Sequence, residues 1–168
     1  MMKRLIRNAA TGMACLAAAL SGVALAVPAH AQYAEKIAND PSRCTGRGPA
    51  VRINVSGIQS AHGNMRVQIY RAVRADWLEK DRWMYRIEAP ARAGSMVFCM
   101  PVPRAGSYAV AIRHDANDNN DTDIFSDGGG MSNNPSVNIF NLGRPSHTRT
   151  AFQVGDAVKA IDIRMRYL

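Results

Sequence analysis

The sequence predicts an all-β fold, an antiparallel β-sandwich of about seven strands. Three observations predict it. Apolar residues alternate with polar ones at a period of two, glycines and prolines interrupt these runs at short intervals, and no segment requires a helix of more than about two turns. The alternating runs cover residues 51–55, 65–69 and 161–167.

The individual strands follow from these patterns. Val51, Ile53 and Val55 alternate with polar residues, as expected of a strand with one buried and one solvated face. Residues 65–69 and 161–167 repeat the pattern, whereas 96–100 and 108–112 are apolar on both faces, which favours central strands. Residues 83–87 are a sixth candidate strand, and residues 75–82 predict a short helical turn or a loop.

The first residues predict export. Lys3, Arg4 and Arg7 precede an apolar run, and Ala29-His30-Ala31 supplies the small residues that a signal peptidase recognises. We expect residues 1–31 to be a signal peptide cleaved before Gln32, giving a periplasmic or secreted protein without a transmembrane segment. The alternative is a retained anchor, although the apolar run is shorter than the roughly 20 residues that span a bilayer.

The remaining chain predicts one domain. Residues 32–50 are polar, contain prolines and glycines, and predict an irregular N-terminal arm, while residues 51–168 form the sandwich domain. Removing the three basic residues of the signal from the total of 21 leaves 18, against 13 acidic residues. Because the arginines are scattered singly, nucleic acid is an unsuitable partner, and anionic envelope lipid or polysaccharide suits the basic surface better.

Two cysteines remain after cleavage, Cys44 and Cys99. An oxidising compartment favours a disulfide between them, which by the chain-entropy argument would add roughly 4 kcal/mol to stability. Neither the paired spacing of a zinc site nor a C-x-x-C redox motif is present.

An unusual acidic loop follows the strand at residues 108–112. Five carboxylates lie between Asp115 and Asp127, and oxygen-bearing side chains recur at every second position. Calcium takes six to eight such oxygens. The loop therefore predicts a calcium site, with these candidate ligands: Asp115, Asn117, Asn119, Asp121, Asp123 and Asp127. Asn120 takes the sixth position, where calcium loops usually have glycine, and asparagine tolerates the left-handed turn required there.

Two alternatives remain open for this loop. Asp and Asn side chains can cap nearby backbone amides in Asx turns that need no metal. Arg113, Arg144 or Arg149 would then fold back to balance the negative charge. Another metal ion is the remaining possibility.

Motif residues in the second half of the chain carry a family resemblance. They are Gly106-x-Tyr108-Ala109-Val110-x-Ile112-x-His114-Asp115-x-Asn117-x-Asn119, then Gly128-x-Gly130-Met131-Ser132-Asn133-Asn134, Gly143-x-Pro145-Ser146 and Ala151-Phe152. In them the chain resembles the exported bacterial family catalogued as domain of unknown function 2141. The resemblance implies a small β-sandwich of immunoglobulin-like or prealbumin-like type, and it supplies no catalytic residue. Family members tend to have a longer segment here, with Ile-Pro and Glu in place of Ile124-Phe125 and Asp127.

Other candidates favour structural roles. His114 shares a face with Val110 and Ile112, which predicts a histidine at the core edge bonded to backbone. Ser146 and His147 form no nucleophile elbow, so we expect no enzyme. A metal-dependent site between the acidic loop and residues 128–134 is the catalytic alternative. Trp77, Trp83 and Tyr85 are either packing residues or a platform for sugar.

These observations lead to one expectation and its alternative. The first is an exported, non-catalytic binding or envelope module with a calcium-binding loop. The alternative is a metal-free structural envelope protein whose basic surface contacts anionic lipid or polysaccharide.

Overall fold

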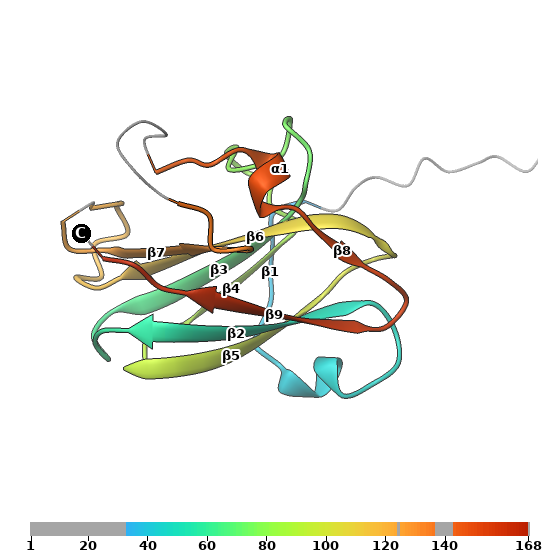
Figure 1. The fold of residues 1–168 in the computed structure, drawn as a ribbon. Coiled ribbons are helices and arrows are strands. Elements are labelled where there is room, and N and C mark those ends of the chain that lie inside the picture. Colours follow the sequence, from blue (N-terminus) through green and yellow to red (C-terminus); the bar gives the residue numbers. More distant parts are fainter. Residues whose placement is uncertain (1–32, 124, 137–142, 168) are drawn as a thin grey trace, which may run out of the picture. The chain divides into compact units, whose positions relative to one another are not determined.

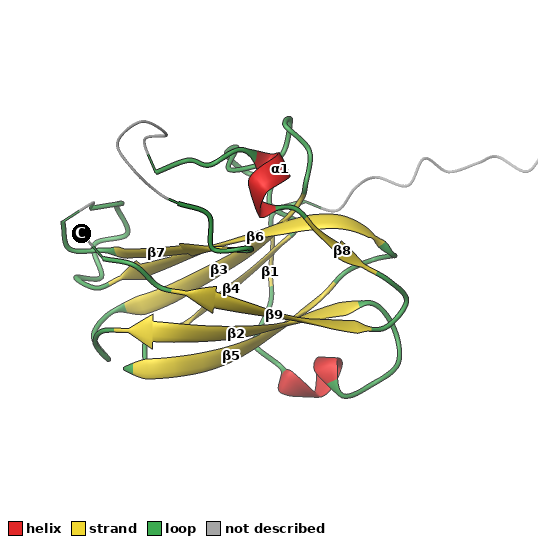
Figure 2. Ribbon diagram, viewed as in Figure 1, coloured by secondary structure: helices red, strands yellow, loops and turns green. Residues whose placement is uncertain are grey.

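The strands form two packed sheets, which confirms the predicted all-β sandwich (Figure 1). The computed structural model describes residues 33–123, 125–136 and 143–167. Its elements are β1 (Glu35–Lys36), the 3₁₀ helix η1 (Pro41–Cys44), β2 (Ala50–Ile58), β3 (Asn64–Arg71), β4 (Tyr85–Pro90), β5 (Gly94–Pro101), β6 (Gly106–Asp115), β7 (Gly128–Met131), α1 (His147–Thr150), β8 (Phe152–Val154) and β9 (Val158–Arg164). Figure 2 shows that helix is confined to the two short segments η1 and α1 in this part of the chain.

The larger sheet has the order β1-β4-β3-β6-β7, with β8 also paired to β6, and the smaller sheet has the order β5-β2-β9. The nine strands exceed the seven expected because β1, β7 and β8 contain only two to four residues each. Runs this short carry no readable alternation.

The sequence predicted an antiparallel sandwich, and most strand pairs are antiparallel, but two pairs among the described residues are parallel. Strand β1 runs parallel to β4, and β9 runs parallel to β2 from Ala50↔Val158 to Ser56↔Arg164. The chain leaves β8 in the larger sheet and enters the smaller sheet at the end where β2 begins. Side-chain alternation is the same in both directions, so a period of two does not reveal strand direction.

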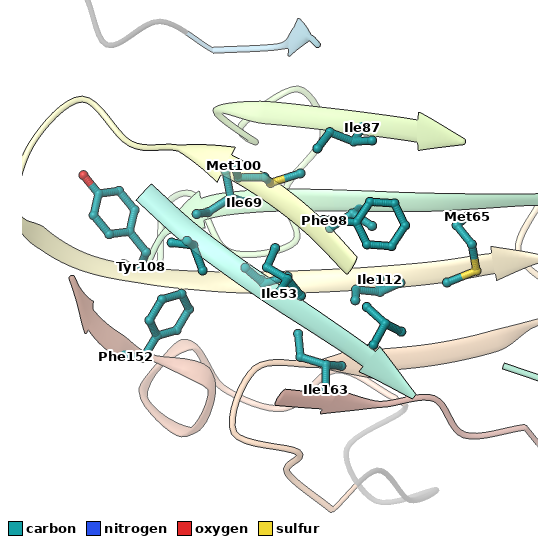
Figure 3. Packing of buried hydrophobic residues seen from close by; sticks show 14 of the residues in the cluster. Ile53, Met65, Ile69, Ile87, Phe98, Met100, Tyr108, Ile112, Phe152 and Ile163 are labelled. Carbon is teal, nitrogen blue, oxygen red and sulfur yellow. The ribbon is translucent and has the colours of Figure 1, made fainter. Parts of the chain in front are cut away.

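The main core lies between the two sheets. Ile53, Phe98 and Ile163 of the smaller sheet face the larger sheet (Figure 3). Met65, Ile69 and Ile112 of the larger sheet close the core from the opposite side, as the alternating pattern predicts. Burial of each such side chain contributes about 1.5–3 kcal/mol.

A second apolar cluster covers the outer face of the larger sheet. Tyr70, Trp77 and Trp83 pack there against Ala109 and Ala111 of β6. The two tryptophans are only 7% and 4% exposed. They are therefore packing residues, and they do not form the exposed sugar platform considered from the sequence.

The segment at residues 32–50 was expected to be an irregular arm, but its described part contains β1 and η1. Strand β1 extends the larger sheet beside β4, and η1 is attached to β5 by the predicted Cys44–Cys99 disulfide, whose Cα atoms lie 5.8 Å apart. The sequence signal for order was weak because a two-residue strand has no period.

The expected signal peptide, residues 1–31, lies outside the described residues. Within the described ranges, the helices are too short and too polar to cross a lipid bilayer.

Candidate functional site

The acidic loop, residues 115–127, connects β6 to β7. Its first residue, Asp115, is the last residue of β6 and is 2% exposed. One carboxylate oxygen of Asp115 accepts a hydrogen bond from the amide of Asn119 at 3.2 Å, and the other accepts from the amide of Asn120 at 2.9 Å. Asp115 therefore closes the first turn of the loop onto the end of the strand.

Arg113 supplies a positive charge to this turn from inside β6. Its Nη2 donates to the Asp115 carboxylate at 3.1 Å and to the Asn120 carbonyl at 3.0 Å. Its Nη1 donates to the Asp121 carbonyl and to the hydroxyl of Thr122. One guanidinium, 14% exposed, thus binds four oxygens of the acidic loop. Arg144, another candidate for this role, donates instead to the Leu78 carbonyl.

Three predicted ligands meet in the middle of the loop. The amide nitrogens of Asn117 and Asn119 donate to the same oxygen of Asp123, at 2.9 and 2.7 Å. The hydrogen bond from Asn117, followed by that from Asn119, lowers the pKa of Asp123 below its ordinary value. The oxygens of both asparagines accept backbone amides two residues further along, as in Asx turns.

The other predicted ligands besides Asp115 are Asp121 and Asp127, and their side chains make no hydrogen bond to the Asp123 carboxylate. Asp127 is 7% exposed and accepts the amides of Ala116 and Asp123, at 3.2 and 3.1 Å. Asp121 contributes its carbonyl to Arg113. Among the described residues, no group of three or more His, Cys, Asp or Glu side chains is arranged to hold a metal ion.

The loop backbone adopts the expected left-handed turn. Asn120 has φ of 66° and Asp118 has φ of 57°, values that Asn and Asp adopt more easily than most residues. Asp118 also accepts a hydrogen bond from the side chain of Asn64 on β3. The neighbouring Gly63 fits against the base of the loop, because a Cβ there would lie 1.8 Å from the Asp115 carbonyl oxygen.

His114 is a fully buried core histidine bonded to backbone, as predicted. Its Nε2 lies 2.8 Å from the His62 carbonyl oxygen, and its Nδ1 lies 2.7 Å from the Tyr167 hydroxyl. The two rings pack edge to face with centroids 5.7 Å apart. Because both ring nitrogens are engaged, His114 is occupied in attaching the C-terminal segment to the sheet.

The glycines of the motif at residues 128–134 allow close packing. A Cβ on Gly128 would lie 2.3 Å from the Tyr167 ring, and a Cβ on Gly130 would lie 2.8 Å from Ile163. Gly129 faces open space and forms the bridge to Arg166 that joins the larger sheet to the C-terminal segment. The motif was considered as one wall of a catalytic site, and these contacts give its glycines a structural explanation.

The polar residues of the same motif attach neighbouring backbone. The buried Ser132 hydroxyl accepts from the Val110 amide at 3.0 Å and donates to the Thr150 carbonyl at 2.6 Å. Asn133 donates to the Ala151 carbonyl. Asn134 donates to the Asp162 carbonyl and accepts from the Arg164 amide, so it satisfies backbone groups on the open edge of β9.

A hollow of about 890 Å³ lies beside the acidic loop. Its lining includes Arg66, Arg113, Gly129, Met131 and Asp127. Both Asp127 oxygens already accept backbone amides, and Arg113 is bound to the acidic loop.

The sequence did not identify the residues that organise this region. Tyr167 was assigned only to a strand face, and Arg113 was one of three arginines considered.

A family model described as an uncharacterized protein conserved in bacteria (DUF2141) matches residues 53–162. Comparison with curated proteins and with solved structures finds no match to the chain.

Proposed function

Because the chain belongs to this uncharacterized bacterial family (DUF2141), we propose its function from its own geometry: it is an exported, non-catalytic β-sandwich module of the bacterial envelope. Its acidic loop is a metal-free surface loop held by Arg113. The observation that carries this proposal is the binding of one guanidinium to four oxygens of the loop.

The charge balance of the loop supports a metal-free state. Arg113 places a permanent positive charge beside Asp115, and each hydrogen bond to a charged group contributes about 1.5–3 kcal/mol. Asp115 and Asp127 each accept two backbone amides as well. The loop is therefore ordered by groups that belong to the chain.

The contacts of the motif residues support a non-catalytic role. A general base needs a ring nitrogen or carboxylate directed at a substrate, yet His114 uses both nitrogens inside the core. Ser132 is fully buried and bonded to backbone on both sides. We therefore expect that these residues catalyse no reaction.

Calcium binding is the second candidate, and the convergence of Asn117, Asn119 and Asp123 favours it. Rotation of an asparagine amide by about 180° exchanges the positions of its nitrogen and oxygen. If both amides turned over, their oxygens would face the Asp123 carboxylate and resemble part of a calcium shell. The described orientation instead satisfies Asp123 with amide hydrogens.

A calcium titration of thermal stability separates the two candidates. The metal-free loop gives the same thermal midpoint in EDTA and in millimolar calcium. A calcium site gives a saturable rise that magnesium does not reproduce, worth about 1.4–2.7 kcal/mol at tenfold to hundredfold excess over the dissociation constant.

The partner that we propose for the envelope role is anionic lipid or polysaccharide. Without the three basic residues of the expected signal peptide, the chain has 18 basic against 13 acidic residues, and exposed Arg52 and Lys159 lie outside the acidic loop. Sedimentation with anionic vesicles or acidic polysaccharide at low and high salt tests this, since screening weakens such contacts. If the protein sediments with neither the vesicles nor the polysaccharide at low salt, the proposal is contradicted.

A further inference from the structure

The acidic loop carries one unusually exposed aromatic residue, Phe125. Its side chain is 85% exposed, compared with 45% for Val73 and 40% for Val97, the other exposed large hydrophobic residues in the described ranges. Burial of an aromatic side chain supplies much of the energy of many protein interfaces. A phenyl ring held in water by its own fold is therefore available to a partner.

Hydrogen bonds join the residues on either side of Phe125, Asp123 and Asp127. The Asp127 amide donates to the Asp123 carbonyl at 2.8 Å, and the Asp123 amide donates to the Asp127 carboxylate at 3.1 Å. Asp123 is in turn bound by two asparagines. An anchor that is rigid before binding loses little conformational entropy on association.

The surroundings of Phe125 are acidic. Asp121 and Asp123 lie within four residues of it in the sequence, and Asp118 is another exposed carboxylate of the same loop. The complementary surface would be an apolar hollow with a basic rim.

The chain has such a hollow, which we call the Trp77 pocket. It measures about 640 Å³, and its lining includes Trp77, Leu78 and Pro145 as apolar walls with Arg74, Arg144 and His147 around them. Trp77 is held in place because its indole nitrogen donates to the Pro145 carbonyl at 2.7 Å.

The charge around the Trp77 pocket is suited to an acidic partner. Arg144 is 59% exposed, and the nearest carboxylate that it contacts is Glu79 at 3.7 Å, itself 57% exposed and also part of the lining. Exposed pairs of this kind hold together weakly. Arg144 also donates to the Leu78 carbonyl at 3.0 Å, which places its guanidinium at the rim of the pocket.

Within one molecule the pocket and the phenyl ring do not meet, because Phe125 is almost fully exposed. We propose that they meet between molecules: Phe125 of one copy enters the Trp77 pocket of a second copy, with the acidic loop against Arg74 and Arg144. The two surfaces differ, so the contact is heterologous and leads to a ring or a chain of copies unless two copies exchange loops reciprocally.

Sedimentation equilibrium of the exported protein with its disulfide formed tests the proposal. At about 50 mM NaCl the mean mass should rise above that of the monomer between about 10 µM and 500 µM protein, the range of a weak, small interface. At about 500 mM NaCl association should weaken because screening reduces the contact between carboxylates and arginines.

Two variants test the two sides of the contact separately. Phe125→Ser removes the anchor and Arg144→Glu reverses the rim charge, and each should weaken self-association about tenfold or more. The matched controls are Val97→Ser, at an exposed residue of β5, and Arg52→Glu, at an exposed residue of β2, and both should associate as the natural chain does.

Mixing the two variants provides the sharpest comparison. Phe125→Ser retains the pocket, and Arg144→Glu retains the anchor, so together they should form heterodimers through one intact contact. A natural chain that stays monomeric across the whole range, a Phe125→Ser chain that associates normally, or a mixture without heterodimers would overturn the proposal. Circular dichroism of each variant excludes misfolding as the cause of lost association.

Discussion

The guanidinium of Arg113 donates to the carboxylate of Asp115 at 3.1 Å, from two positions earlier on the same strand. Both residues point to the outer face of the larger sheet, and the chain turns back over them through the acidic loop. Arg113 thereby neutralises one of the five carboxylates of the loop. Its removal should therefore affect the whole loop.

Arg113→Gln should lower the free energy of unfolding by about 2–4 kcal/mol, because it leaves Asp115 buried without its positive partner. Urea unfolding at neutral pH measures the loss. Arg52→Gln is the control, since Arg52 is exposed and contacts only the Asn54 side chain, and it should change stability by less than about 0.5 kcal/mol. Equal effects of the two changes would contradict the role given to Arg113.

Gly128→Ala should destabilise the fold by about 1–3 kcal/mol, the usual cost of overpacking. The new methyl group would meet the Tyr167 ring and displace it from His114. Thermal unfolding measures the cost. Gly129→Ala is the matched control, because nothing lies within 4 Å of a Cβ there, and a similar loss in both variants would refute the packing argument.

The decrease in the free energy of unfolding at acidic pH should depend on Asp123. Hydrogen bonds from Asn117 and Asn119 lower the pKa of Asp123 in the folded state. The pKa of an aspartate in the unfolded chain is about 3.9. Because the folded-state pKa of Asp123 is lower, ionised Asp123 stabilises the fold above the unfolded-state pKa, and this stabilisation is lost as the pH falls through the folded-state pKa. The stability advantage of the natural chain over Asp123→Asn should therefore shrink below about pH 4.

Urea midpoints between neutral pH and about pH 2.5 measure this dependence. Asp156→Asn, a change at an exposed carboxyl group outside the acidic loop, serves as the control. An Asp123→Asn chain whose acidic limb parallels that of the natural chain would show that Asp123 adds nothing there.

Reduction of the Cys44–Cys99 bond should cost roughly 4 kcal/mol, because the bond spans 55 residues. Unfolding with and without dithiothreitol measures the difference. A Cys44→Ser, Cys99→Ser chain should have the stability of the reduced protein and should not respond to dithiothreitol. A response of that variant would place the effect elsewhere.

Much of the fold could be predicted because alternation records which face of a strand is buried. Val51, Ile53 and Val55 all point into the core as expected. The same reasoning placed His114 at the core edge. Alternation could not predict strand direction, because parallel and antiparallel strands have the same period. It also could not predict β1, because a strand of two residues has no period.

The sequence predicted the candidate site as a set of oxygen ligands. It identified the acidic loop but not the residues of the chain that contact this loop. Tyr167 and Gly128 are 39 positions apart in the numbering, and only the fold brings the ring against the glycine. Arg113 was one of three arginines considered for folding back onto the loop, and the sequence did not choose among Arg113, Arg144 and Arg149. The binding of Arg113 to the loop depends on how the chain turns after Asp115, which no local pattern reports.

The thermal midpoint of the oxidised domain, residues 32–168, in EDTA and across a calcium titration, with magnesium as the control, tests the central claim most directly. A metal-free loop gives an unchanged midpoint up to several millimolar calcium, and a lowered midpoint in Arg113→Gln that calcium does not restore. A saturable rise specific to calcium would contradict it and would establish the acidic loop as a cation site.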